Sequence, residues 1–214
     1  MSIILIGGEK GGTGKTTLAV NMAAARAKEG HDVLVVDTDP QGSASYWAAA
    51  REEKGVVPRI ASIQKFGKTL ASELKDLSNR YEDIIVDAGG RDSIELRSGL
   101  VVADRAYVPI QASQFDVWTL DQMDSLVNQA QGLNPDLKAY VVINRASTNP
   151  MVEESNEARQ MLNEFESLVL LESIIRDRIA YRKAARDGMA VFELPKLDHK
   201  ACAEINSLYQ EIYG

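Results

Sequence analysis

The sequence predicts an α/β fold, a doubly wound and mostly parallel sheet flanked by helices. Short apolar runs alternate with longer amphipathic stretches along the whole chain. The apolar runs lack polar alternation, which is typical of strands buried on both faces of a parallel sheet. A glycine-rich segment, GGEKGGTG, follows the first apolar run directly. Doubly wound folds bind phosphate groups at such a turn between a strand and a helix.

Five runs rich in Val, Ile, Leu or Tyr are expected to form strands. They are Ser2–Ile6, Asp32–Asp37, Asp83–Asp87, Arg105–Ile110 and Ala139–Ile143. Helices are expected near 15–28, 43–53, 67–79, 93–102, 116–131 and 152–165. A last helix is expected because Ala201, Ile205, Leu208 and Ile212 share one helical face. No linker or internal repeat divides the chain, so residues 1–214 are expected to form a single domain.

The composition sets limits on function. The net charge of −7 argues against a protein that coats nucleic acid over its whole surface, although a local basic patch remains compatible with it. One cysteine excludes an internal disulfide and a site built from cysteines alone, such as an iron–sulfur cluster. The sequence shows no apolar run of about 20 residues and no basic leader before its first apolar run. We therefore expect a cytoplasmic protein with no membrane partner.

The segment GGTGKTT predicts a loop that binds phosphate. Five of the 15 glycines lie between residues 7 and 14, where they let backbone N–H groups turn inward around an anion. The helix that follows adds its positive N-terminal end. Lys15 is expected to reach the β- and γ-phosphates of a nucleotide, Thr16 to bind Mg²⁺ and Thr17 to contact the α-phosphate. The remaining loop residues expected to contact the nucleotide are Gly11, Gly12, Thr13 and Gly14.

The loop departs from the usual pattern G-x-x-x-x-G-K-[ST] at one position, because Glu9 replaces the first glycine. The run KGGTGKTT resembles the deviant Walker A motif of the ParA/MinD family of ATPases. In that family a signature lysine stands at the place of Lys10. The resemblance implies that Lys10 reaches across a nucleotide-sandwich homodimer to the phosphates held by the other subunit. Glu9 either orients Lys10 in the monomer or faces solvent.

Carboxylates follow two of the expected strands. Asp37 and Asp39 stand in VVDTDPQGS, and Asp87 ends the run DIIVD before AGGRDS. Ligands bind at the carboxyl ends of strands in such sheets, and an apolar strand ending in Asp is the Walker B arrangement that holds Mg²⁺ through a water. The resemblance implies that Asp39 positions the attacking water and that Asp37 supports the outer shell of the metal. Arg91 is as compatible with a structural role as with a functional one.

Two polar residues end a later apolar run, VVINRAS. Asn144 stands where the family often places a side chain that contacts the base, and an Asn amide matches the donor and acceptor edge of adenine. Arg145 is expected to stack on the base or to cover its outer face. The implied cofactors are ATP and Mg²⁺.

Residues 175–193 form a basic stretch on an otherwise acidic chain. Arg178, Arg182 and Arg186 would share one face of a helix, at a spacing suited to phosphates along DNA. The complete set of expected DNA contacts is Arg176, Arg178, Arg182, Lys183 and Arg186. The stretch also resembles a C-terminal segment of family members that bind DNA non-specifically in the ATP state. The alternative is a solvated helix face whose charges pair with one another.

The resemblance, from Ile3 to Glu193, implies an ATPase that dimerises with ATP and partitions or positions a cargo such as a plasmid, a chromosome or a protein complex. It implies nucleoid association, a ParB-like or other adaptor protein, and hydrolysis that is slow until that partner acts. The last helix lacks a basic amphipathic face, which favours the DNA-cycling branch over the membrane-cycling branch. The loop begins at residue 7, so the small branch without an N-terminal extension is expected. The alternatives are a metabolic phosphate-loop enzyme, such as an amidoligase or kinase, and a scaffold with an inactive site.

Overall fold

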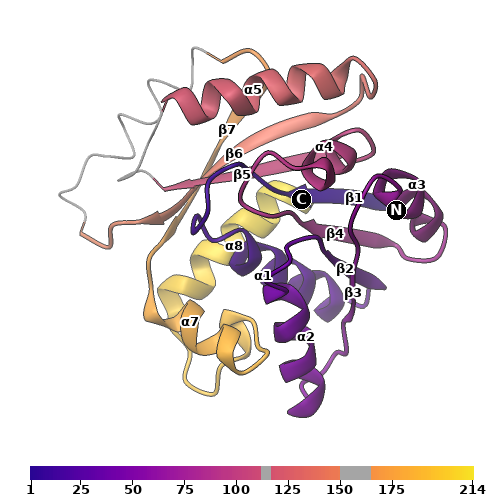
Figure 1. Cartoon of the computed structure of the whole chain (residues 1–214). Helices are drawn as coiled ribbons and strands as arrows, with labels where there is room; N and C mark the ends of the chain where they lie inside the picture. Colours follow the sequence, from indigo (N-terminus) through magenta and orange to yellow (C-terminus); the bar gives the residue numbers. More distant parts are fainter. Residues whose placement is uncertain (112–116, 150–164) are drawn as a thin grey trace.

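The computed structural model describes residues 1–111, 117–149 and 165–214 (Figure 1). Within these residues, seven strands form one sheet in the order β3-β2-β4-β1-β5-β6-β7. Every pair of neighbouring strands is parallel. The predicted fold class, a doubly wound parallel sheet between helices, is confirmed.

The strands are β1 (Ser2–Ile6), β2 (Val33–Asp37), β3 (Ala61–Gln64), β4 (Asp83–Asp87), β5 (Arg105–Gln111), β6 (Lys138–Ala146) and β7 (Leu168–Arg176). The helices are α1 (Lys15–Lys28), α2 (Ser43–Glu53), α3 (Leu70–Ser78), α4 (Ile94–Leu100), α5 (Val117–Gln131), α7 (Ile179–Arg186) and α8 (His199–Tyr213), with a short 3₁₀ helix, η2 (Val191–Glu193). Among the described helices, none combines the length and the apolar character that crossing a membrane requires.

The five predicted strands are present, but β3 and β7 were not predicted. Both lie at the edges of the sheet, where a strand needs no continuous apolar run. β3 has only four residues, all partly or fully exposed. β7 carries Glu172 and Ser173 in its middle. The helix expected at 152–165 lies, apart from residue 165, outside the described residues.

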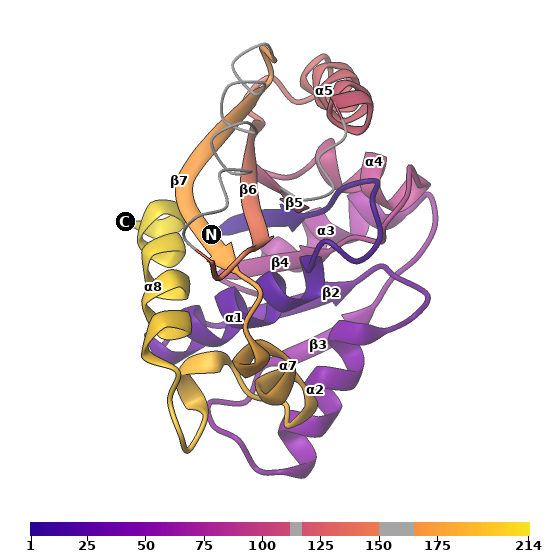
Figure 2. The same cartoon turned by 90° about the vertical axis from the view of Figure 1, so that its left-hand side faces the viewer.

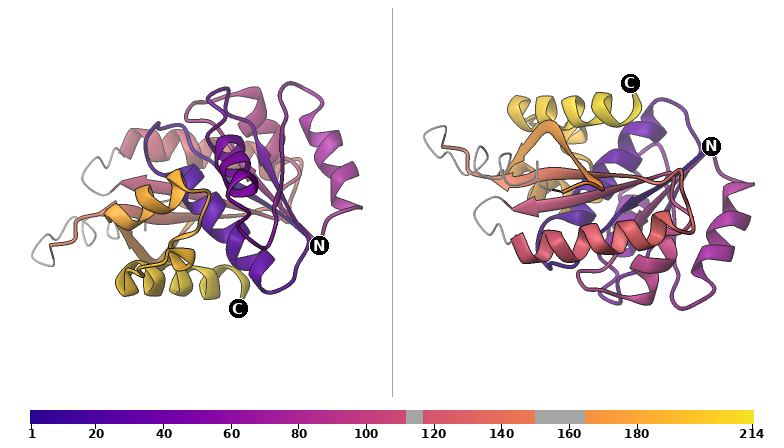
Figure 3. Two further views of the ribbon diagram at one scale, coloured as in Figure 1. Left: turned by 90° about the horizontal axis from the view of Figure 1, so that it is seen from below. Right: turned by 90° about the horizontal axis from the view of Figure 1, so that it is seen from above.

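Helices cover both faces of the sheet (Figures 1 and 3). On one face, α1, α2, α7 and α8 pack against side chains such as Ile4 and Ile6 of β1. On the other face, α3, α4 and α5 pack against the alternate residues, Ile3 and Leu5. Successive side chains of a strand point to opposite faces, so an uninterrupted apolar run such as β1 supplies both cores.

The register of the sheet sets where the polar residues meet. Asp37, the last residue of β2, lies opposite Asp87, the last residue of β4. Asp87 in turn lies opposite Ile6 at the end of β1. The loop after β1 therefore begins beside Asp87, and Asp37 lies one strand further along the sheet.

Candidate functional site

The phosphate loop, residues 7–14, connects β1 to α1. Gly12 and Gly14 adopt left-handed backbone conformations, with φ of 77° and 89°, which residues with a Cβ adopt only at a cost. Gly14 is the N-cap of α1 and has no side chain to bind the first N–H groups of the helix. These donors therefore face the loop, where an anion can accept from them.

Three side chains hold loop carbonyls in place. Asn144 donates to the carbonyl of Thr13 at 2.7 Å, and Arg145 donates to the carbonyl of Gly12 at 2.7 Å. The ammonium of Lys15 donates to the carbonyl of Lys10, also at 2.7 Å. In a trans peptide the C=O and the following N–H point in opposite directions. Fixing these carbonyls thus orients the N–H groups of the next residues away from them, as a phosphate cradle requires.

Asn144 and Arg145, which the sequence predicts to contact a base, both bind the phosphate loop in this structure. Asn144 is 2% exposed and its amide nitrogen is used by the loop. A Cβ on Gly14 would lie 2.4 Å from that nitrogen, so the glycine is also required for this contact. Arg145 has a φ of 53°, a conformation uncommon outside glycine. In this structure both side chains hold the loop through its carbonyl groups, and any contact with a base stays a prediction.

Replacing Asn144 with Ala should weaken ATP binding about tenfold, because the buried carbonyl of Thr13 loses its partner at a cost of roughly 1–3 kcal/mol. Titration with a fluorescent ATP analogue measures the effect. Asn134→Ala is a matched control, since Asn134 donates to the carbonyl of Ala103 at 2.8 Å, away from the loop. Equal affinities of the two variants would contradict the supporting role of Asn144.

Lys15 lies inside the loop and is only 7% exposed. Burial lowers the pKa of its ammonium, while the nearby carboxylates of Asp87 and Asp39 act in the opposite direction. Gly90 packs against this group, since a Cβ there would lie 3.1 Å from Nζ and 2.8 Å from the Cα of Gly11. The lysine is therefore confined between the loop and the segment after β4, and a bound polyphosphate would compensate its buried charge.

Asp87 is the most perturbed acid of the site. Burial raises the pKa of its carboxyl to about 7, partly offset by a hydrogen bond that the hydroxyl of Thr16 donates to it at 2.6 Å. The nearby charge of Asp37 raises the pKa of Asp87 further. A carboxyl whose pKa is shifted by burial and by neighbouring charges is a candidate for a functional site.

The raised pKa predicts a pH dependence of stability. Between about pH 4 and pH 7 the folded state holds a proton on Asp87 that the unfolded state has lost, so stability falls as the pH rises through this window. The expected loss is on the order of a few kcal/mol. Urea unfolding of wild type and Asp87→Asn at pH 5 and pH 8 measures it. The free energy of unfolding of the wild type, relative to that of the variant, should be lower at pH 8 than at pH 5. An equal difference at both pH values would contradict the raised pKa of Asp87.

Asp37 and Asp39 organise the loop after β2. The fully buried carboxylate of Asp37 accepts hydrogen bonds from the N–H of Asp39 at 3.1 Å and the N–H of Ser45 at 2.9 Å. The carboxylate of Asp39 is partly exposed and accepts from the N–H of Gln41 at 2.9 Å. A Cβ on Gly89 would lie 3.5 Å from that carboxylate. The segments that follow β2 and β4 therefore meet beside Lys15.

The residues brought together here suit Mg²⁺. Thr16 and Asp87 offer hydroxyl and carboxylate oxygens, the ligands that Mg²⁺ prefers. No cluster of three or more His, Cys, Asp or Glu side chains forms a complete metal cage in the described part of the chain. Mg²⁺ is usually held by one or two protein groups together with phosphate oxygens and waters, rather than by a full cage. A cation beside Asp87 would also favour its charged form.

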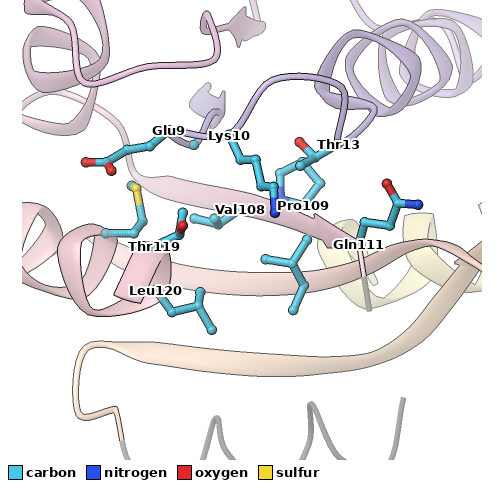
Figure 4. A pocket seen from close by; sticks show the side chains of 11 residues that line it. Glu9, Lys10, Thr13, Val108, Pro109, Gln111, Thr119 and Leu120 are labelled. Atoms are coloured by element: carbon cyan, nitrogen blue, oxygen red, sulfur yellow. The ribbon is translucent and has the colours of Figure 1, made fainter. Parts of the chain in front are cut away.

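Lys10 and Glu9 point in different directions (Figure 4). The side chain of Lys10 extends from the loop toward Pro109, and both residues line one small pocket with Thr13 and Gln111. Glu9 points away from Lys10. Burial and the charge of Asp92 raise the pKa of Glu9, and Arg97 lowers it. The charges that act on Glu9 thus come from the start of α4, which does not favour the alternative that it orients Lys10.

The basic stretch differs in part from the expected helix. Arg176 ends β7, and Arg178 is the N-cap of α7 with an extended backbone. Both donate to the carboxylate of Glu204 in α8, at 3.3 Å and 2.6 Å. The expectation that Arg178 shares an exposed helix face with Arg182 and Arg186 is therefore wrong: only 14% of its side chain is exposed, because it is paired with Glu204.

Three of the five expected DNA contacts lie on the exposed side of α7. Arg182 and Arg186 have side chains 62% and 77% exposed, and Lys183 is exposed as well. Arg182 pairs with Asp177 at 3.0 Å and Arg186 with Asp187 at 3.3 Å. Such exposed pairs contribute little to stability and exchange readily for other anions. The structure therefore contains the internal ion pairs of the alternative interpretation and still leaves a basic helix at the surface.

A family model described as the CobQ/CobB/MinD/ParA nucleotide binding domain matches residues 4–191. The chain belongs to this family. The resemblance to ParA/MinD ATPases that the loop and its two lysines indicated is thereby confirmed.

Relatives extend over almost the whole chain. The "Maintenance of carboxysome distribution protein A" of Halothiobacillus neapolitanus is 29% identical over 206 residues, which cover 95% of this chain and 92% of the relative. The protein of the same name from Gloeobacter kilaueensis is 32% identical over 186 residues, covering 86% and 81%. The solved structure of apo McdA from Cyanothece superposes with a TM-score of 0.78 at 18% identity and covers both chains completely, which supports the fold.

Proposed function

We propose that this protein is an ATPase that dimerises around Mg-ATP, binds DNA non-specifically in its ATP state and positions a cargo. The observation that carries the proposal is the arrangement of the two loop lysines. Lys15 is buried beside Asp87 and Asp39, whereas the side chain of Lys10 extends toward Pro109 of β5. One lysine suffices for the nucleotide of its own chain. The second loop lysine, Lys10, is proposed to contact the phosphates held by a second copy of the chain.

The proposed reaction is attack of water on the γ-phosphate of ATP. Asp39, partly exposed and next to Gly89, is the candidate for positioning the water. Lys15 and the loop N–H groups would stabilise the charge that develops on the phosphate oxygens. Mg²⁺ held by Thr16 and Asp87 would neutralise charge on the β- and γ-phosphates.

Neither of the two histidines lies at this site as a candidate base: His31 contacts Glu82, and His199 begins α8. Catalysis by positioning and charge alone predicts slow hydrolysis until a partner acts.

The nature of the cargo is inferred from the relatives. Two of them carry the name "Maintenance of carboxysome distribution protein A", and a third, 28% identical over 174 residues, is the chromosome partitioning protein ParA of Myxococcus xanthus. The similarity to the two carboxysome distribution proteins extends over more of the chain than the similarity to ParA. This favours a protein assembly as cargo over a plasmid or chromosome. An adaptor protein would link the cargo to the ATPase, and DNA binding would place the protein on the nucleoid.

The DNA surface is proposed to be α7, with Arg182, Lys183 and Arg186. Binding to long random-sequence duplex DNA, measured without nucleotide, with ADP and with ATP, tests it. We expect binding at least about tenfold tighter with ATP than with ADP, weakened by added salt because phosphate contacts release counterions. Arg182→Glu with Arg186→Glu should reduce the binding about tenfold or more.

Lys75→Glu with Arg80→Glu is the matched control for the DNA experiment. It makes the same change of charge at exposed positions on and just after α3, which covers the other face of the sheet. Equal losses in both double variants would mean that only net charge matters. Absence of DNA binding in every nucleotide state would refute this part of the proposal and favour the metabolic enzyme, for which small-molecule phosphate acceptors are the next test.

A further inference from the structure

The segment after the basic helix is fixed to α2 by a buried ion pair. Arg51 of α2 is 1% exposed, and its guanidinium donates two hydrogen bonds of 2.8 Å to the carboxylate of Glu193. It also donates to the carbonyl of Gly188 at 3.0 Å and to the carbonyl of Pro58 at 2.9 Å. All three nitrogens of the guanidinium donate in these contacts, and the paired bonds to Glu193 fix the orientation of the two side chains.

The backbones of α2 and of the turn after α7 also touch directly. Gly188 has a φ of 66°, and a Cβ there would lie 2.2 Å from the backbone nitrogen of Arg51. The indole of Trp47 donates to the carbonyl of Met189 at 3.1 Å. Outside this buried core, Lys54 pairs with Asp187. Figure 2 shows α7 lying against α2. The end of the basic helix is therefore packed closely against α2.

The same segment is attached to α1. The side-chain oxygen of Asn21 accepts a hydrogen bond from the N–H of Val191 at 2.9 Å, and its amide donates to the carbonyl of Thr17 at 2.7 Å. Asn21 is 2% exposed. Residues 188–193 are thus attached to two helices, and each of these helices begins at a loop of the nucleotide site.

α2 begins at the loop that contains Asp39. The carboxylate of Asp37 binds the N–H of Asp39 and the N–H of Ser45 in the first turn of α2. Through these bonds, a displacement of residues 37–42 on nucleotide binding would move the start of α2. The opposite end of α7 is held differently, because Arg178 is bonded to Glu204 of α8. A shift of α2 would move one end of α7 while the other stays fixed, and the helix would tilt.

We propose that Arg51 and Glu193 are positioning residues that couple the nucleotide state of the loop at 37–42 to the orientation of the basic helix α7. This inference rests on the proposed function, because it explains how DNA binding would depend on ATP. Well-packed apolar residues can replace a buried ion pair without loss of stability. The pair specifies instead a single arrangement of two segments that are 142 residues apart.

The test compares Arg51→Met with Glu193→Gln against a matched control, Glu52→Gln with Arg59→Met. The control removes the same charges from a pair that is 67% and 72% exposed and does not reach residues 188–193. Glu193→Gln keeps an oxygen for the N–H of Ala190, which Glu193 binds at 2.7 Å. Two quantities are measured: the ratio of DNA affinities with ATP and with ADP, and the hydrogen exchange of the amides of residues 179–187 with and without Mg-ATP.

We expect the affinity ratio to fall from about tenfold or more to below about threefold in the Arg51 and Glu193 double variant, with ATP affinity changed by less than about threefold. Mg-ATP should alter amide exchange in α7 of the wild type and of the control, but not of the double variant. A folded double variant that keeps both responses would overturn the inference. So would a wild type whose α7 exchange is the same with and without Mg-ATP.

The same measurements remain decisive if the wild type binds no DNA or if the double variant does not fold. If the wild type binds no DNA in any state, the proposed DNA function fails, while the exchange of α7 still decides the coupling. If thermal melting shows that the double variant does not fold, Glu193→Gln alone replaces it. This variant keeps the bonds from Arg51 to the carbonyls of Gly188 and Pro58. A partial reduction of both responses is then expected, and unchanged responses would overturn the coupling.

Discussion

Replacing Lys15 with Ala should abolish ATP hydrolysis and weaken ATP binding by about 100-fold or more, a loss of roughly 2.7 kcal/mol. The reason is its location. The ammonium is almost fully buried, donates to the carbonyl of Lys10 and lies near the carboxylates of Asp87 and Asp39. A polyphosphate in the loop would complete its neutralisation in a site that excludes water, where charge-assisted contacts are strong. Calorimetric titration with Mg-ATP and a phosphate-release assay measure both effects.

Lys28→Ala is the control for this prediction. Lys28 is exposed at the far end of the same helix, so its removal should leave nucleotide binding unchanged. Lys15→Arg should not restore activity, because the planar guanidinium is larger than an ammonium and a Cβ on Gly90 would already lie 3.1 Å from the Lys15 ammonium. An ATP affinity of Lys15→Ala within about threefold of wild type would show that the nucleotide binds elsewhere.

Replacing Lys10 with Ala should abolish the ATP-dependent dimer while leaving ATP binding to the monomer within about threefold of wild type. Lys10 is only partly buried, and its side chain extends toward Pro109, with which it lines a pocket. Its loss would therefore cost little to a nucleotide bound in the same chain. Loss of a cation from a buried pair with phosphate in the partner site would cost several kcal/mol of association. Light scattering in the presence of a slowly hydrolysed ATP analogue measures the dimer.

Lys10→Arg tests whether charge alone is sufficient, and it should retain part of the dimer. Hydrolysis should fall together with dimerisation in Lys10→Ala. If a Lys10→Ala variant dimerised normally with ATP, Lys10 would either contact the nucleotide of its own chain or be a surface residue without a role in the dimer.

The parts of the site that the sequence predicted are those set by local order along the chain. The loop, Lys15 and Thr16 follow β1 within a few residues, and Asp87 ends an apolar strand. The parallel register then brings Asp37 opposite Asp87. Once the strands are identified, ligands at the carboxyl edge of the sheet follow from the topology.

The parts that sequence reasoning missed depend on contacts between distant segments. The amide of Asn144 and the loop carbonyl that it binds are 131 residues apart, so the sequence predicts a base contact for this Asn but not its bond to the loop. The spacing of Arg178 to Arg182 predicts a shared helix face. In the structure Arg178 is instead the N-cap of α7 and donates a hydrogen bond to Glu204. The pairing of Arg51 with Glu193 left no signal in the spacing of either residue.

The central claim is that ATP, and not ADP, makes this chain a dimer, and sedimentation equilibrium of the wild type tests it most directly. The mass is measured with no nucleotide, with Mg-ADP and with a slowly hydrolysed analogue of Mg-ATP. We expect the 23.5 kDa of one chain in the first two states and twice that mass in the third. One mass in all three states, whether of monomer or dimer, would contradict it and leave Lys10 without the function proposed for it.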